Sequence, residues 1–253
     1  MAGLLEKLSL LETNQNNQLK VSSEATLRLC RLARDAILII RRCYEIFPGS
    51  ISFSFNGGKD STVVLHLMRM ALAEIRKSSA SDGSARDTFL TSSCNNTFTD
   101  IKAFYFKSNE CFEEEAAFIE STNNTFNVDV KYLDCAFKDG LKILSEEDGV
   151  KVIAMGTRRS DPHGKTLERL SPSSPGWPNF LRLNPCLDWE YDDIWNFLRL
   201  FEIPYCKLYD QGYTSIGSKT NTIPNDALKV GENKYKPAYM LEDTSTERVG
   251  SRK

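Results

Sequence analysis

Short runs of β-branched and aromatic residues alternate with longer amphipathic segments over residues 22–155. The runs that predict strands are ISFSF (51–55), IKAFYF (101–106), VDVKYL (128–133) and VKVIAM (150–155). Apolar residues at three- and four-residue spacings predict helices over 22–47, 61–77, 111–122 and 136–147. Strands that alternate with helices form right-handed crossovers, so the pattern predicts an α/β fold with a Rossmann-like, mostly parallel sheet and helices on both faces.

Two other segments break this alternation. Residues 78–98 are rich in serine and asparagine and have no period, so we expect a flexible surface insertion there. After residue 157 the chain is rich in proline, glycine and hydroxyl residues, and only 190–201 has a clear helical pattern, with Asp188 expected as its N-cap.

The domain organisation follows from these segments. The chain of 253 residues is 41% hydrophobic, which is enough to bury one large core. We expect a single domain over residues 1–253, in which a nucleotide-binding α/β core (20–157) carries an irregular substrate-binding extension (158–253).

Charge and cysteine usage exclude several classes of function. There are 32 Lys and Arg against 34 Asp and Glu, so no global basic field attracts nucleic acid or anionic lipid. Seven cysteines without a C-x-x-C pair argue against a disulfide framework, a zinc site and a dithiol redox centre. Glu6 and Lys7 interrupt what would be the apolar part of a signal peptide. We expect a cytoplasmic monomer with no nucleic-acid or membrane partner, and leave an organellar or nuclear location open.

A glycine pair follows the first predicted strand, in the stretch Asn-Gly-Gly-Lys-Asp-Ser (56–61). A strand, a glycine-rich turn and a helix start bring backbone N–H groups and a helix dipole to one anion. The spacing is not that of the ATPase P-loop, because Phe53 stands where its first glycine would be and Asp60 follows the lysine. An ordinary turn is the alternative, but it does not require so many potential phosphate ligands.

The stretch SFNGGKDST (54–62) resembles the pyrophosphate-binding loop of the ATP-pyrophosphatase superfamily, in the version shared by phosphoadenylylsulfate reductases and eukaryotic FAD synthases. Four later motifs, in this order, resemble the FAD synthase (FMN adenylyltransferase) family: GTRRSDPHG (156–164), SPGWPNFLRLNPCLDWEYDDIW (174–195), YDQGYTSIGSKTNT (209–222) and YMLEDTSTERVGSRK (239–253). The resemblance implies an adenine nucleotide alpha hydrolase-like fold. It also implies Mg²⁺-assisted transfer of the adenylyl group of ATP to FMN, which gives FAD and pyrophosphate.

The resemblance also implies an ATP site. The residues expected to bind ATP are Ser54, Asn56, Gly57, Gly58, Lys59, Asp60, Ser61, Phe106, Gly156, Arg158, Gly212, Thr214 and Ser215. Among them we expect Asn56, Asp60 and Arg158 to be catalytic, and Phe106 to flank adenine. Asn56 and Asp60 also offer the hard oxygen ligands that Mg²⁺ prefers. For the loop around Gly212, a plain loop is the alternative.

A flavin site is implied within the C-terminal extension. The residues expected to bind flavin are Arg159, Asp161, Trp177, Arg248 and Arg252. Trp177 stands between a glycine and a proline without periodicity and offers a stacking face. The ending ERVGSRK has one residue more before Arg252 than the family's E-R-x-G-R, which leaves the role of Arg252 open. Asp161 precedes Pro162, so turn initiation is its alternative role.

The implied reaction needs no general base, and His163 is therefore not assigned as one. A phosphate monoester has its second pKa near ~6, so the attacking FMN phosphate is already largely dianionic at neutral pH. Three alternative functions remain: a phosphoadenylylsulfate reductase, a tRNA-modifying ATP pyrophosphatase, and a non-catalytic nucleotide or flavin-binding protein. A reductase would need a reactive cysteine near the carboxyl terminus, and no cysteine follows Cys206. A tRNA-modifying enzyme would need paired cysteines or a basic surface for RNA, and the sequence indicates neither.

Overall fold

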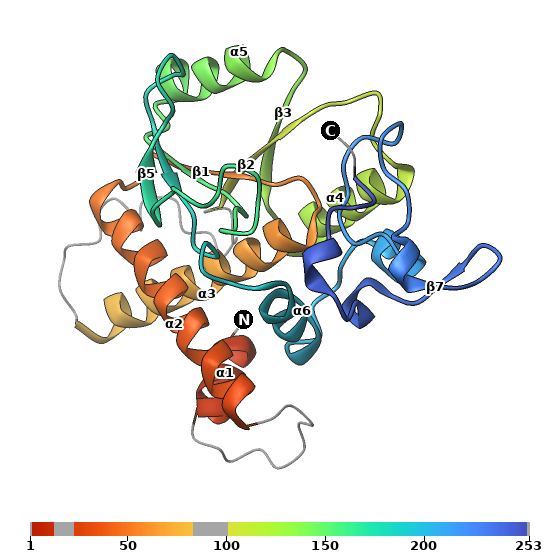
Figure 1. Ribbon diagram of the computed structural model, residues 1–253. Helices are drawn as coiled ribbons and strands as arrows, with labels where there is room; N and C mark the ends of the chain where they lie inside the picture. Colours follow the sequence, from red (N-terminus) through yellow and green to blue (C-terminus); the bar gives the residue numbers. More distant parts are fainter. Residues whose placement is uncertain (1, 13–22, 83–100, 252–253) are drawn as a thin grey trace.

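The computed structural model describes residues 2–12, 23–82 and 101–251 (Figure 1). Its helices are α1 (Ala2–Glu12), α2 (Ser23–Ile46), α3 (Lys59–Asp82), α4 (Glu113–Phe126), α5 (Phe137–Lys142), which continues as a π-helical turn (Ile143–Glu147), and α6 (Tyr191–Leu200). Its strands are β1 (Ile51–Ser54), β2 (Lys102–Phe106), β3 (Asp129–Leu133), β4 (Val152–Ala154), β5 (Leu170–Pro172), β6 (Leu181–Leu183), β7 (Lys229–Gly231) and β8 (Lys234–Tyr235).

Six of these strands form one sheet in the order β3-β2-β1-β4-β6-β5. All neighbours in it are parallel except β5, which runs antiparallel to β6. The predicted mostly parallel α/β sheet is confirmed. The chain leaves the central strand β1 toward β2 on one side and later reaches β4 on the other, and such a reversal opens a crevice at the carboxyl ends of the strands.

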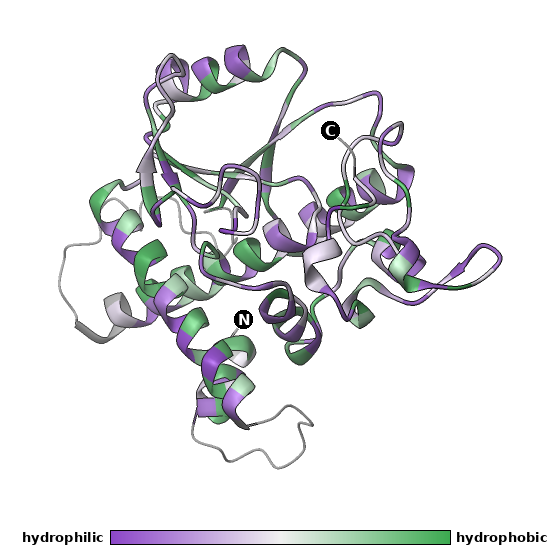
Figure 2. Cartoon of the chain, viewed as in Figure 1, coloured by the Kyte–Doolittle hydropathy of each residue, from purple (hydrophilic) through white to green (hydrophobic). Residues whose placement is uncertain are grey.

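Both faces of the sheet are covered, as the alternation of apolar residues requires. In β2, Ala103 belongs to a large core that also contains apolar residues of α1, α2, α3 and α6, whereas its neighbour Phe104 belongs to a smaller core beneath α5. The turns of α2 alternate between apolar and polar in Figure 2, in keeping with a helix buried along one face. The predicted helices on both faces are therefore present.

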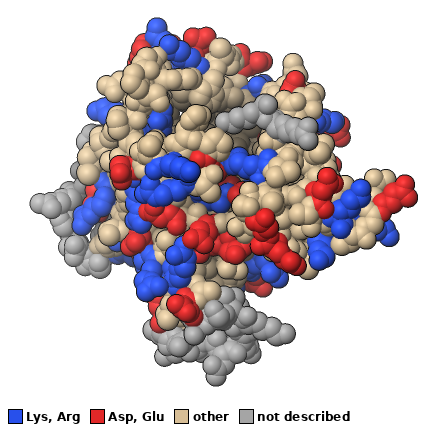
Figure 3. Space-filling view, in the orientation of Figure 1, with Lys and Arg blue, Asp and Glu red and all other residues tan. Residues whose placement is uncertain are grey.

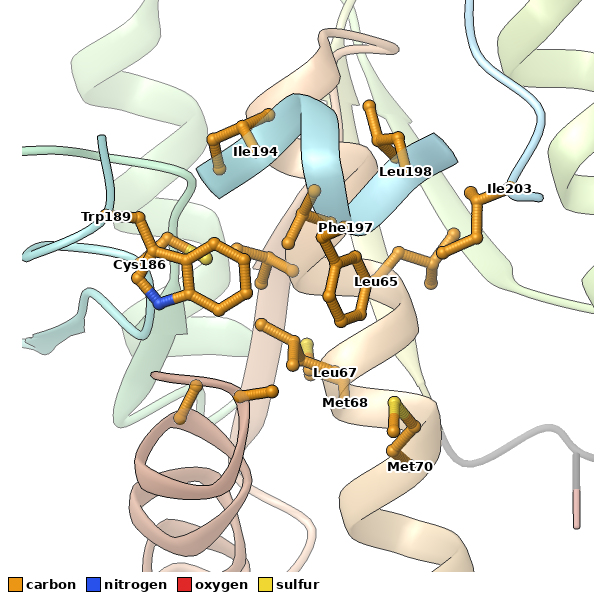
Figure 4. Close-up of a cluster of buried hydrophobic side chains, with 14 of the residues drawn as sticks. Leu65, Leu67, Met68, Met70, Cys186, Trp189, Ile194, Phe197, Leu198 and Ile203 are labelled. Atoms are coloured by element: carbon orange, nitrogen blue, oxygen red, sulfur yellow. The ribbon is translucent and has the colours of Figure 1, made fainter. Parts of the chain in front are cut away.

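Helix α3 packs on the sheet and on α6. Its residues Leu65, Leu67 and Met68 are completely buried, and Figure 4 shows Leu67 and Met68 beneath the ring of Phe197 of α6. Because α3 starts at the glycine pair, this packing fixes the direction in which the loop's helix points. Among the described residues, we find no helix with the length and apolar character needed to cross a membrane.

The structure differs from the expected elements in three places. Residues 78–82 continue α3 instead of starting the insertion, and the remainder of that predicted segment, 83–98, lies outside the described residues. The N-cap of α6 is Glu190, whose backbone N–H donates to Asp193 Oδ2 (2.8 Å), and the N-cap prediction for Asp188 was wrong. The C-terminal extension adds strands β5 and β6 to the sheet, which its proline-rich pattern had not indicated.

Candidate functional site

The glycine loop is held by its own side chains at the end of β1. Asn56 Oδ1 accepts the backbone N–H of Gly58 (3.1 Å) and the hydroxyl of Ser61 (2.8 Å). Gly57 has a φ of +69°, and a Cβ there would lie 3.0 Å from a side-chain carbon of Ile119 in α4. Glycine is therefore required at this position by both conformation and space.

The end of β4 packs against the same loop. A Cβ at Gly156 would lie 2.8 Å from the backbone nitrogen of Ser61 and 2.9 Å from the carbonyl carbon of Asp60. Glycine thus lets the segment after β4 approach the first turn of α3 closely at the crevice of the sheet.

A pocket of about 220 Å³ opens above the loop. It is lined by Ser54, Asn56, Gly58, Lys59, Asp60, Ser61, Met155, Gly156, Thr157, Asp161, Tyr209, Ser215, Ile216 and Arg248. We call it the loop pocket. The structure thus brings together eight residues of the predicted ATP site, namely Ser54, Asn56, Gly58, Lys59, Asp60, Ser61, Gly156 and Ser215, around one concave surface.

Other residues of the predicted ATP site lie elsewhere. Thr214 is buried and donates its hydroxyl to the backbone carbonyl of Glu247 (2.6 Å). Gly212, with a φ of +88°, packs against Tyr235. The ring of Phe106 lies beside that of Phe137 (4.6 Å between centroids).

Behind the loop lies a buried ion cluster of four residues, Lys59, Asp60, Arg158 and Glu247. Lys59 Nζ donates to Glu247 Oε1 (2.5 Å) and to Asp60 Oδ2 (3.1 Å). Arg158 Nη2 donates to both oxygens of Glu247 (2.5 and 2.6 Å), and Arg158 Nε lies 2.7 Å from Asp60 Oδ1. Two cations and two carboxylates therefore neutralise one another inside the protein.

The cluster governs the protonation of its members. Burial alone would raise the pKa of Asp60, but the charges of Lys59 and Arg158 outweigh it and lower that pKa below the ordinary value. Burial opposes the charge of Arg158, yet Asp60 and Glu247 raise its pKa above the ordinary value. Asp60 is accordingly ionised and Arg158 protonated at neutral pH.

Arg158 is one of the residues expected to bind ATP, but it is buried in the ion cluster. Its side chain is 1% exposed and, within the described part of the chain, is not among those that line the loop pocket. It faces a hollow of about 280 Å³ on the other side of the cluster, beside Arg159 and Asp188. Arg159 pairs there with Asp188 (Nε to Oδ1, 2.5 Å), away from the loop pocket.

Two larger pockets adjoin the loop pocket. An apolar pocket of about 460 Å³ shares Ser54, Met155 and Thr157 with it, and is further lined by Phe104, Phe137, Leu141, Ile153, Pro162, His163, Thr166, Leu167, Ser174, Trp177, Phe180 and Arg182. Trp177 is 40% exposed there, and its ring lies 5.9 Å from that of Phe137. The residues predicted for adenine and for flavin stacking, Phe106 and Trp177, therefore flank the same phenylalanine.

The second adjoining pocket, of about 580 Å³, is lined mainly by polar and charged residues, and we call it the polar pocket. It shares Asp161 and Arg248 with the loop pocket. These two side chains form an ion pair, and the other carboxylate oxygen of Asp161 accepts the backbone N–H of Arg158 (2.9 Å). His163 and Lys165 also line this pocket. Arg252 lies outside the described residues.

The residues predicted as metal ligands are already engaged. Asn56 Oδ1 accepts two hydrogen bonds, and both oxygens of Asp60 face cations. Over residues 2–12, 23–82 and 101–251, no group of three or more His, Cys, Asp or Glu side chains is arranged to hold a metal ion. Asp60 Oδ1 is buried and accepts no hydrogen bond, but Arg158 Nε lies 2.7 Å from it, so the cation that this oxygen faces belongs to the protein.

Sequence analysis did not single out two residues of the site. Glu247 is 5% exposed and Tyr209 is 2% exposed, and both contact Lys59. Each stands inside a motif used above, YDQGYTSIGSKTNT or YMLEDTSTERVGSRK, so position within those motifs was the available signal. Acidic and basic side chains are interspersed on the visible face of the molecule (Figure 3), so the surface charge does not point to the site.

The chain is similar in sequence to several known proteins. The family model for the phosphoadenosine phosphosulfate reductase domain matches residues 50–224. A probable FAD synthase from Schizosaccharomyces pombe is 33% identical over 217 residues, which cover 85% of this chain and 77% of that protein. A probable FAD synthase from Caenorhabditis elegans is 34% identical over 234 residues, or 90% of this chain and 41% of that protein. The chain thus spans about two fifths of the length of its nematode relatives.

A solved structure extends the comparison to the fold. Candida glabrata FMN adenylyltransferase, in complex with FMN and the ATP analog AMPCPP, superposes with a TM-score of 0.78 over 97% of each chain at 23% identity. The likeness covers the strands and helices that surround the loop pocket and its two neighbours.

Proposed function

Because the chain belongs to the FAD synthase family, within the larger family of the phosphoadenosine phosphosulfate reductase domain, we propose that it transfers the adenylyl group of ATP to FMN. One observation carries the proposal. A pocket at the glycine loop, suited to phosphates, shares walls with two larger pockets, one apolar and one polar. ATP and FMN aligned for reaction have the same order of parts, since their phosphates meet between the adenine and flavin ring systems.

The loop is proposed to hold the phosphates that leave. Backbone N–H groups at the start of α3, the hydroxyl of Ser61 and the charge of Lys59 surround the loop pocket. They would stabilise negative charge as it develops on the departing pyrophosphate, which is the main requirement of phosphoryl-type transfer.

The chemical step needs alignment rather than proton removal. An oxygen of the FMN phosphate forms a bond to the α-phosphorus of ATP, and the bond from that phosphorus to the bridging oxygen of the β-phosphate breaks. The electron pair leaves with pyrophosphate. The FMN phosphate is already largely dianionic, so we assign no general base. Arg248 and Asp161, between the loop pocket and the polar pocket, are proposed to orient FMN.

Mg²⁺ enters the proposal as the ion that ATP carries. The oxygens of Asn56 and Asp60 are engaged within the protein, so we derive no step through a metal held by them. When bound with ATP, the ion would offset the repulsion between the two reacting anions.

A reducing compartment is also part of the proposal. Six cysteines of the described residues are free thiols, and four of them belong to the main core: Cys30, Cys43, Cys186 and Cys206. Free thiols are the usual state in the cytoplasm, and they support a cytoplasmic location.

The direct test is to incubate the protein with FMN, ATP and Mg²⁺ and to measure FAD and pyrophosphate together. We expect both products in equal amounts. Asp60→Ala should lower turnover by about 100-fold or more while FMN still binds, because it leaves Lys59 and Arg158 without one of their two anions.

The matched control is Asp148→Asn, which neutralises a surface carboxylate paired only with Lys131. It should keep normal turnover. Pyrophosphate release with another acceptor, but not with FMN, would favour one of the alternative functions, and near-normal turnover of Asp60→Ala would remove Asp60 from the mechanism.

A further inference from the structure

Glu247 is a buried acid of the C-terminal segment that meets two cations from distant parts of the chain. Its carboxylate accepts from Lys59 Nζ (2.5 Å) and from Arg158 Nη2 (2.5 and 2.6 Å). Its side chain is 6% exposed, so water does not compete for these contacts. Of the four residues in the ion cluster, it is the one that joins the extension's last turn to the loop.

The backbone of Glu247 is fixed from the other side. The hydroxyl of Thr214 donates to its carbonyl oxygen (2.6 Å), and Asn225 Nδ2 donates to the carbonyl of Thr246 (2.9 Å) and to Thr214 Oγ1 (3.2 Å). Thr214, Asn225 and Glu247 are buried. This accounts for the buried hydroxyl of Thr214, which holds the acid in place rather than lining the loop pocket.

Glu247 reaches the loop pocket only through other side chains. It lines the polar pocket and the hollow beside Arg159, whereas Lys59 and Asp60 line the loop pocket itself. The rings of Tyr191 and Tyr209 lie 5.3 and 5.9 Å from Lys59 Nζ and restrict its path further. The position of the loop lysine is therefore set by a residue that does not itself line the loop pocket.

The net charge of the ion cluster predicts whether a substitution in it weakens or strengthens ATP binding. Lys59 and Arg158 contribute two positive charges, and Asp60 and Glu247 contribute two negative ones. Removing Arg158 alone leaves one excess negative charge behind a pocket proposed to bind polyphosphate. Removing Glu247 alone leaves one excess positive charge and frees the lysine.

We propose that Glu247 is a positioning residue that fixes Lys59 and Arg158 against Asp60 and so sets both the charge and the geometry of the phosphate loop. The expected change in turnover rests on the proposed function. The expected changes in ATP affinity require only that ATP binds in the loop pocket.

The test measures ATP affinity by calorimetry, without FMN, for wild type, Arg158→Gln, Glu247→Gln and the double variant. Arg158→Gln should weaken ATP binding by about tenfold, the effect expected of one unpaired charge a few ångströms from the ligand. Glu247→Gln should bind ATP at least as tightly as wild type. The double variant, whose remaining Lys59 and Asp60 are balanced, should recover most of the affinity lost in Arg158→Gln.

Turnover provides the second readout. Glu247→Asp keeps the charge but withdraws the carboxylate by one methylene, so ATP affinity should stay within about threefold while kcat falls about tenfold or more. Asp148→Asn serves as the control for both measurements. Because Glu247→Asp keeps its charge, it also tests the proposal if Glu247→Gln does not fold.

The outcomes separate cleanly. A double variant that binds ATP as weakly as Arg158→Gln would overturn the proposal, as would wild-type kcat in Glu247→Asp. If wild type makes no FAD but the four affinities keep the expected order, the proposed reaction fails and the positioning role of Glu247 stands.

Discussion

The hydroxyl of Tyr209 accepts a backbone hydrogen bond that the loop could otherwise donate to a phosphate oxygen. It accepts the backbone N–H of Lys59 at 2.9 Å, and the tyrosine also lines the loop pocket. That N–H belongs to the first turn of α3, where helices leave donors unpaired. This donor of the loop is therefore already paired, and an anion must compete with the phenol for it.

Tyr209→Phe should consequently separate stability from anion binding. The variant leaves the N–H of Lys59 without its acceptor, and we expect the free energy of unfolding to fall by about 1–3 kcal/mol. Pyrophosphate can then supply the missing acceptor, so it should raise the melting temperature of the variant by more than it raises that of wild type.

The control is Tyr205→Phe, which removes an exposed hydroxyl bonded to Asp210 (3.0 Å). It should change neither quantity beyond experimental error. Equal pyrophosphate-induced shifts in wild type and Tyr209→Phe would mean that the phenol and the anion do not share a donor.

At the residue scale, the sequence pattern locates the part of the predicted site that is contiguous. Residues 54–61 adjoin one another in the chain, and all of them except Phe55 and Gly57 line the loop pocket. Glu247 contacts Lys59 across 188 positions, and a lone acidic residue in an irregular segment has no spacing that reveals such a partner. Arg158 is similar, because adjacent arginines look exposed in a sequence and only the fold shows one of them buried.

At the scale of elements, length decided which predictions held. The strands β1, β2 and β3 come from runs of five or six residues that are rich in β-branched and aromatic side chains, and they are present. Strands β5 and β6 have three residues each, which is too short for a period of two to be recognised, and β5 ends in a proline. They form because the edge of β4 offers a ladder of hydrogen bonds, which is a property of the assembled sheet.

Helix α6 offers a prediction at this scale, because two adjacent carboxylates at its start have opposite roles. Asp193 accepts the N–H of Glu190 and pairs with Arg28 of α2 (3.1 and 2.9 Å), so Asp193→Asn should cost about 1–3 kcal/mol of unfolding free energy. Asp192 is exposed, and burial together with the charges of Asp193 and Glu190 raises its pKa.

Asp192→Asn is therefore the matched control, and it should be neutral or slightly stabilising because it removes repulsion. Chemical denaturation of the two variants measures both values. A larger loss for Asp192→Asn than for Asp193→Asn would contradict the assignment of the cap.

At the scale of the whole molecule, His66 makes stability depend on pH. It is buried in α3, its Nδ1 lies 3.0 Å from Arg69 Nη1, and its ring lies 4.9 Å from Phe126. Burial, assisted by the charge of Arg69, lowers its pKa to about 3. The folded protein keeps this histidine neutral, whereas the unfolded chain binds a proton below its ordinary pKa of about 6.5.

The free energy of unfolding should therefore decrease as pH falls from about 6.5 toward 3, by up to about 1.4 kcal/mol per pH unit from this group. His66→Gln should be flatter over that interval. Between pH 7 and 8, where the histidine is neutral in both states, the two proteins should run parallel. Denaturation at a series of pH values measures the slopes, and identical slopes below pH 6 would show that His66 does not titrate on unfolding.

The long reach of the Lys59–Glu247 contact has a consequence for biosynthesis. The ribosome delivers the loop lysine early and its anion 188 residues later, after the strands that surround the loop. Until then, a nascent chain holds two cations and one carboxylate at the centre of its sheet. Translation order thus leaves the loop with an excess positive charge and an unfixed lysine until the tail emerges, so the geometry of the nucleotide site is completed last.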